Sequence, residues 1–118
     1  MATPSDVGRA GEDAAARVYL DRGYRLVARN WRCRIGELDL IVRRGDTLVV
    51  CEVKARRGAR FGGGYEAVDG RKQQKLRAVA EVYLQRSAIT TEQVRFDVAS
   101  VVVGPNGSAR VELFEDAF

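Results

Sequence analysis

The sequence predicts an α/β protein in which a mixed five-stranded sheet is flanked by helices. Three observations lead to this expectation. Periodic and alternating apolar patterns follow one another in the order helix, three strands, helix, two strands. A length of 118 residues suits one domain, which we expect to cover residues 1–118. The composition, 46% hydrophobic and 31% charged, excludes a disordered tail and a membrane protein.

The first helix is predicted over residues 9–20, with Ser5 and Asp6 as candidate caps. Gly8 and Gly11 lie in its first turns, where each costs about 1 kcal/mol relative to alanine. This cost indicates that another part of the molecule comes close, either for packing on a strand or for function. The expected buried stripe, at helical spacing, consists of Ala10, Ala14, Ala15 and Val18.

Three strands are predicted next. Residues 24–32 form a strand-like run, and residues 36–44 and 48–54 read as an antiparallel hairpin around a Gly-Asp turn. Strand alternation places Leu38, Leu40 and Val42 on one face of the middle strand and Glu37, Asp39, Ile41 and Arg43 on the other.

The second half of the chain begins with a basic loop over residues 56–64, where glycine occupies four of nine positions. A helix is expected over residues 69–85, followed by strands over residues 94–103 and 109–114. The helix has an expected buried stripe of Leu76, Val79, Ala80, Tyr83 and Leu84, and a cationic first half with Arg71, Lys72, Lys75 and Arg77.

The basic excess is confined to one third of the chain. The formal net charge is +4, but residues 22–60 carry eleven basic and four acidic side chains, a net +7. Seventeen of the twenty basic residues are arginine, which can bind phosphates through two hydrogen bonds. This asymmetry favours a surface that faces a polyanion, although a GC-rich genome explains the arginine excess equally well.

The chain has no histidine, which excludes histidine bases, Ser-His and Cys-His nucleophile pairs and most zinc sites. Its two cysteines, Cys33 and Cys51, form no C-x-x-C motif, and we expect two reduced, partly buried thiols. No signal peptide is recognisable, and no segment approaches the roughly 20 apolar residues of a membrane span. We therefore expect a soluble, cytoplasmic protein.

Asp39, Glu52 and Lys54 form the candidate site. Glu52 and Lys54 share one strand face, and Asp39 on the neighbouring strand can reach the same place. Carboxylates suit Mg²⁺ or Mn²⁺, which bind phosphate oxygens and activate water, and a nearby lysine can orient or deprotonate that water. This set fits hydrolysis of a phosphodiester in a nucleic acid. The alternative is a structural ion pair between Glu52 and Lys54, because E-x-K is common on strands.

Five short motifs lie along the chain. They are Gly11-Glu12, Asn30-Trp31-Arg32, Gly36-Glu37-Leu38-Asp39-Leu40-Ile41, Glu52-Val53-Lys54 and Arg95-Phe96-Asp97. In this order and spacing they resemble the motifs of the YraN family of small bacterial proteins. The resemblance covers residues 8–98, and the family is itself similar to the PD-(D/E)XK nuclease superfamily, in particular to archaeal Holliday junction resolvases. It implies a restriction-endonuclease-like fold with a central mixed sheet.

The resemblance also implies roles for single residues. Asp39 matches the motif aspartate of the superfamily, and Glu52 and Lys54 match its (D/E)-x-K, which makes these three the expected catalytic residues. Glu12 matches the helix carboxylate that completes the metal shell in the resolvase branch, so the expected Mg²⁺ or Mn²⁺ ligands are Glu12, Asp39 and Glu52. Leu38 departs from the proline that gives the superfamily its name, a position that is widely replaced.

The expected partner is DNA, contacted by Arg56, Arg57 and Arg60 just past the candidate site. The resemblance adds Lys72, at the start of the second helix, as a further nucleic-acid contact. Trp31 either stacks on a base or packs in the core.

Two functions are compatible with these features. The first is a Mg²⁺-dependent endonuclease that hydrolyses phosphodiester bonds in structured DNA, including branched and repair intermediates, with a homodimer implied by the resolvase-like relatives. The second is a non-catalytic nucleic-acid-binding or partner-recruiting module on the same fold.

Overall fold

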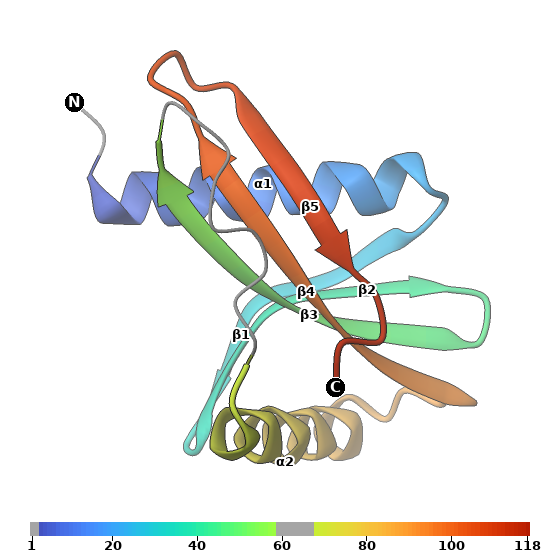
Figure 1. Ribbon diagram of the computed structural model, residues 1–118. Helices are drawn as coiled ribbons and strands as arrows, with labels where there is room; N and C mark the ends of the chain where they lie inside the picture. Colours follow the sequence, from blue (N-terminus) through green and yellow to red (C-terminus); the bar gives the residue numbers. More distant parts are fainter. Residues whose placement is uncertain (1–2, 59–67) are drawn as a thin grey trace.

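The computed structural model describes residues 3–58 and 68–118, where helices and strands follow the predicted order (Figure 1). The strands form one sheet in the order β1-β2-β3-β4-β5, with β3 and β4 parallel and the other neighbours antiparallel. The predicted α/β class and mixed five-stranded sheet are confirmed, and the arrangement is compatible with a restriction-endonuclease-like fold. The elements are α1 (Pro4–Asp21), β1 (Arg25–Cys33), β2 (Gly36–Arg44), β3 (Thr47–Arg57), α2 (Gly70–Ser87), β4 (Gln93–Val103) and β5 (Ala109–Phe114).

A hydrophobic core lies on each face of the sheet. Because side chains alternate along a strand, β3 contributes Val49 and Cys51 to the core under α1, and Leu48 and Val50 to the core under α2. The strand is therefore buried from both sides, as its nearly continuous apolar sequence predicts. The two helices cover opposite faces, and the central strands hold them apart.

The start of α1 and its buried stripe differ from the prediction. Thr3 is the N-cap: its side chain accepts a hydrogen bond from the Asp6 amide at 3.1 Å, and the Asp6 carboxylate accepts one from the Thr3 amide at 3.0 Å. This reciprocal capping box places Asp6 inside the helix rather than at its cap. The buried face is turned relative to the expected stripe and consists of Val7, Gly11, Ala15, Ala16 and Tyr19, with Ala10, Ala14 and Val18 only half-buried.

Gly11 explains this orientation. A Cβ atom at position 11 would lie 2.4 Å from the Cβ of Ala55 in β3, closer than atoms can pack, so the helix backbone rests directly on the strand. Residues four positions away on either side of Gly11 then face the sheet as well. Close packing on a strand therefore accounts for this glycine. A Cβ atom at Gly8, by contrast, would have no neighbouring atom within 4 Å.

The buried carboxylate of Asp97 in β4 accepts a hydrogen bond from Tyr19 and thereby ties α1 to β4. Asp97 is fully buried and accepts hydrogen bonds from the Tyr19 hydroxyl at 2.7 Å and from the Arg95 guanidinium at 2.9 and 3.0 Å. The Asp116 amide donates a further bond at 2.9 Å. Burial and the Asp97 charge raise the pKa of Tyr19, whose hydroxyl therefore stays a donor. Because every oxygen of Asp97 is partnered, the buried charge is tolerated.

The basic loop begins later in the chain than expected. Arg56 and Arg57 belong to β3, which extends three residues beyond the predicted strand, because its pairing with β4 continues to Arg57 and Val103. Residues 59–64 of the expected loop lie outside the described residues. Both cysteines are free. Within the described ranges, no helix has a long enough apolar stretch to cross a membrane.

The substitution Gly11→Ala should destabilise the protein by roughly 1–3 kcal/mol, because the added methyl overlaps Ala55 and forces α1 away from β3. The matched control Gly8→Ala, in the same helix but with open space around it, should stabilise by roughly 0.5–1 kcal/mol through the better helix propensity of alanine. Urea denaturation followed by circular dichroism measures both. Equal effects of the two substitutions would contradict close packing at Gly11.

Candidate functional site

The candidate site lies where β2 separates from β3. Their backbone pairing ends at Leu40 and Cys51, although β2 continues toward the β1–β2 turn. At the next position the Asp39 carboxylate accepts a hydrogen bond from the Val53 amide at 2.9 Å, in place of a backbone partner. The side-chain order also changes here: Leu38 packs in the core under α2 rather than beside Leu40, which corrects the predicted alternation.

This separation brings Asp39 and Glu52 together. Burial, followed by the hydrogen bond with Glu52 and its like charge, raises the pKa of Asp39 to about 8. The hydrogen bond from the Val53 amide lowers the pKa of Asp39, and the negative charge of Glu12 raises it. Asp39 is therefore largely protonated at pH 7 in the metal-free protein. Two of the carboxylates expected from the sequence thus adjoin each other.

Lys72 neutralises the second carboxylate. Its Nζ lies 2.9 Å from Oε2 of Glu52, whose side chain is only 10% exposed. The hydrogen bond to Glu52 raises the pKa of Lys72, which keeps the amine charged. Among the described residues the ion-pair partner of Glu52 is Lys72, so the alternative of a structural pair with Lys54 is wrong. Lys72 reaches Glu52 from the first turn of α2, where the Asp69 side chain caps the helix by accepting from the Lys72 amide.

Glu12 lies close by but is held by other groups. Its carboxylate accepts a hydrogen bond from Asn30 Nδ2 at 3.1 Å and pairs with Arg29 at 3.4 Å. Asn30 has a left-handed backbone (φ 51°), uncommon for a residue other than glycine, which directs it from β1 toward α1. No three acidic or thiol groups of the described residues are close enough together to hold a metal ion in this conformation.

A divalent cation nevertheless fits the Asp39–Glu52 pair. Two adjoining, largely buried carboxylates are unfavourable when both are ionised, and hard oxygen ligands are those that Mg²⁺ and Mn²⁺ prefer. The pair could supply two ligands to such a cation. Glu12 would be a third if it exchanged Arg29 and Asn30 for the cation.

The remaining predicted residues lie along β3 and beyond it. Lys54 is half-buried, two positions after Glu52 on the same strand face. Arg56 and Arg57 follow at the exposed end of the strand. Arg60, the third arginine expected to bind DNA, lies outside the described residues.

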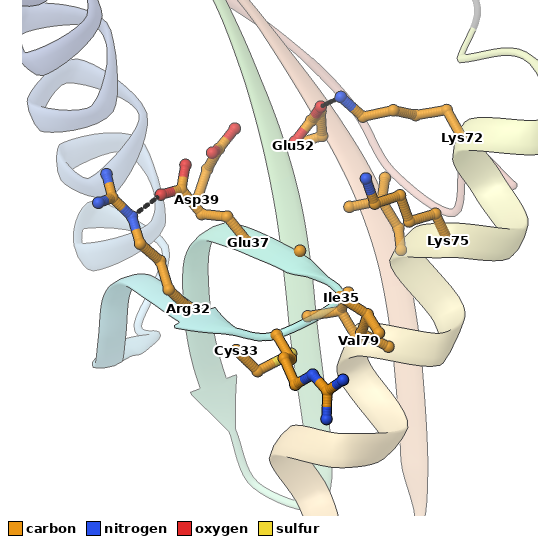
Figure 2. A pocket seen from close by; sticks show the side chains of 12 residues that line it. Arg32, Cys33, Ile35, Glu37, Asp39, Glu52, Lys72, Lys75 and Val79 are labelled. Atoms are coloured by element: carbon orange, nitrogen blue, oxygen red, sulfur yellow. Dashed lines mark hydrogen bonds and ion pairs between the residues drawn. The ribbon is translucent and has the colours of Figure 1, made fainter.

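Two cavities meet beside these carboxylates. One of about 480 Å³ is lined by Asp39, Glu52 and Lys72, and Figure 2 shows Lys72 and Lys75 extending from α2 toward it. The other, of about 520 Å³, contains Glu12. Both are lined by Arg32 and Glu37, which form an ion pair. The Arg32–Glu37 pair therefore borders both cavities.

The sequence did not predict four contacts of the site. They are the Arg29 and Asn30 bonds to Glu12, the Arg32–Glu37 pair and the Lys72–Glu52 pair. The only signal was the Asn-Trp-Arg motif. Its tryptophan, Trp31, packs edge-on against Tyr83 of α2 at 5.1 Å between ring centroids, which favours the core role.

Fold and site together define a small α/β protein with a buried acidic pair at the opening of a strand hairpin, beside a cationic helix start. Residues 11–101 match the Uncharacterised protein family UPF0102, and the chain belongs to this family, which is the YraN family indicated by the motifs. The UPF0102 protein of Parafrankia sp. (strain EAN1pec) is 48% identical over 118 residues, all of both chains. That of Symbiobacterium thermophilum is 48% identical over 112 residues, 95% of each chain.

The substitution Asp39→Asn should stabilise the metal-free protein because it removes the carboxylate and keeps an acceptor for the Val53 amide. The wild-type loses stability as pH rises from about 4, where the unfolded aspartate ionises, through about 8, where the folded one does. The variant lacks this loss, so its stability relative to wild-type should increase over that range, by several kcal/mol (about 1.4 kcal/mol per unit of pKa shift) at pH 8.

Thermal unfolding in EDTA at several pH values measures this difference. Asp21→Asn, at the exposed end of α1, is the matched control and should follow the wild-type curve. A difference between Asp39→Asn and wild-type that stays constant from pH 5 to pH 8 would contradict the raised pKa.

Proposed function

We propose that this protein is a metal-dependent endonuclease that hydrolyses phosphodiester bonds in structured DNA. The observation that carries the proposal is the adjoining Asp39 and Glu52 carboxylates in a cavity whose rim is cationic. A buried acidic pair can bind a cation, and a cationic rim can bind a polyanion. The two together suit a phosphate ester brought to a metal ion.

Asp39 and Glu52 would hold Mg²⁺ or Mn²⁺, with Glu12 as a third ligand. When bound, the metal supplies an activated water and neutralises charge that develops on the phosphate. The Val53 amide fixes the orientation of Asp39, so this ligand needs little rearrangement.

Lys54 and Lys72 have separate roles in this proposal. Lys54, on the strand face of Glu52, would orient or deprotonate the attacking water. Lys72 holds Glu52 in the metal-free protein and, once the cation replaces it, its charge is available to a phosphate of the DNA backbone. Arg56, Arg57 and Arg60 would extend this contact along the strand, and a homodimer would match a substrate with two-fold symmetry.

Cleavage of a DNA panel tests the catalytic residues. With Mg²⁺ or Mn²⁺, the protein should cut at least one of a four-way junction, a flap, a linear duplex and a single strand. Asp39→Asn, Glu52→Gln and Lys54→Ala should each lower the rate at least roughly 100-fold, since each removes a metal ligand or the acid-base group. The exposed control Glu81→Gln should cleave at the wild-type rate. Cleavage that persists in all three variants would show that the activity does not belong to this site.

A second function is favoured by one observation: Glu52 and Glu12 are already paired, with Lys72 and with Arg29 and Asn30. These pairs suit a module that binds nucleic acid without cutting it. Titration calorimetry with Mn²⁺ separates the two functions. For the endonuclease we expect binding in wild-type and Glu81→Gln and its loss, by at least about tenfold in affinity, in Glu52→Gln. No Mn²⁺ binding by a wild-type protein that still binds DNA at low salt would establish the module.

A further inference from the structure

Ile35 is an apolar side chain at an unusual place. With Arg34 it forms the two-residue turn between β1 and β2, and because neither residue has a positive φ, the turn accepts isoleucine without requiring it. The side chain is 46% exposed. Leu20 and Leu26 are similarly exposed, but of these three Ile35 alone lines the cavity that contains Asp39 and Glu52. Turn formation therefore does not explain this residue.

The turn is held firmly in place. A Cβ atom at Gly36 would lie 2.9 Å from Val79 Cγ2 and 3.2 Å from Lys75 Cε, so the hairpin backbone rests on α2 without a side chain between them. Ile35 and Val79 line the same cavity, and Figure 2 labels both where the turn meets α2. Ile35 is thus presented from a supported position, and little order has to be gained when a ligand meets it.

The surroundings of Ile35 are cationic. The same cavity is lined by Arg32, Arg34, Lys72 and Lys75, against three acidic residues. Arg32 and Lys72 are paired with acids, whereas Arg34 and Lys75 form no ion pair with any residue in the described ranges. An exposed apolar group between free cations suits a ligand that offers an apolar surface flanked by phosphates, which is what an unstacked base step of DNA offers.

We propose that Ile35 is a wedge that enters DNA at a step where base stacking is already broken, such as a branch point or the base of a flap. This inference rests on the proposed endonuclease function and names the feature of the substrate that the site selects. Arg34 and Lys75 bind the phosphates on either side of the wedge, and the step is thereby held at the cavity of Asp39 and Glu52. A continuous duplex is disfavoured because its bases would first have to be unstacked.

Binding measured by fluorescence anisotropy tests the wedge, with Ca²⁺ in place of Mg²⁺ and with a four-way junction, a flap and a linear duplex of equal length. Ile35→Ser should weaken binding to the junction and flap by roughly 5- to 20-fold and leave linear duplex binding unchanged. Ile35→Leu should retain the preference. Leu26→Ser, at a side chain that is 44% exposed on β1 and lies outside both cavities described above, is the matched control and should bind all three DNAs as wild-type does.

A 2-aminopurine base at the branch point gives a second readout, since its fluorescence rises when it is unstacked. Wild-type and Ile35→Leu should raise it, and Ile35→Ser should not. The wedge is refuted if Ile35→Ser prefers branched over linear DNA as strongly as wild-type, while the endonuclease proposal is then untouched. A wild-type protein that binds none of the DNAs refutes both.

Discussion

The hydrogen bond from the Val53 amide to the Asp39 carboxylate is the contact on which the site depends. A strand that leaves its neighbour exposes backbone groups that need new partners, and at this point a side chain supplies one. The same bond holds Asp39 next to Glu52, where burial and like charge raise its pKa. Asp39 therefore has two roles at once. Its carboxylate satisfies the Val53 amide where β2 leaves β3, and the same carboxylate forms the acidic pair with Glu52.

Such a pair lowers the stability of the fold that contains it. One carboxylate is relieved by a proton and the other by Lys72, which comes from α2 on the same side of the sheet. Neither contact is needed to build the sheet, whose central strands are apolar on both faces. A buried group that lowers stability and adds nothing to packing is typical of a binding or catalytic site. Asp97 provides a contrast. Asp97 is more deeply buried than either carboxylate of the pair, but both of its oxygens are partnered, and it ties α1 to β4.

The sequence predicted the element order and the meeting of Asp39 with Glu52, because strand alternation and short motifs depend on local spacing. It did not predict that Leu38 and Leu40 face different cores, since this requires knowing where β2 leaves β3. The Asn30–Glu12 contact depends on a left-handed residue in a strand, for which asparagine is only a weak signal. The partners of Glu12 come from β1 and the partner of Glu52 comes from α2, and which residues pair in this way depends on tertiary packing that no local sequence pattern contains.

The parallel pairing of β3 with β4 has a consequence for how the chain reaches this structure. The β1–β2 and β2–β3 hairpins join residues that are close in sequence, whereas Thr47 pairs with Gln93, after the whole of α2. Contacts between distant residues carry a larger loop-closure entropy and form late. We therefore expect the hairpin with Asp39 to form early and the α2 face with Lys72 to dock onto it afterwards. During synthesis, the acidic pair would be assembled before the cation that neutralises it has emerged.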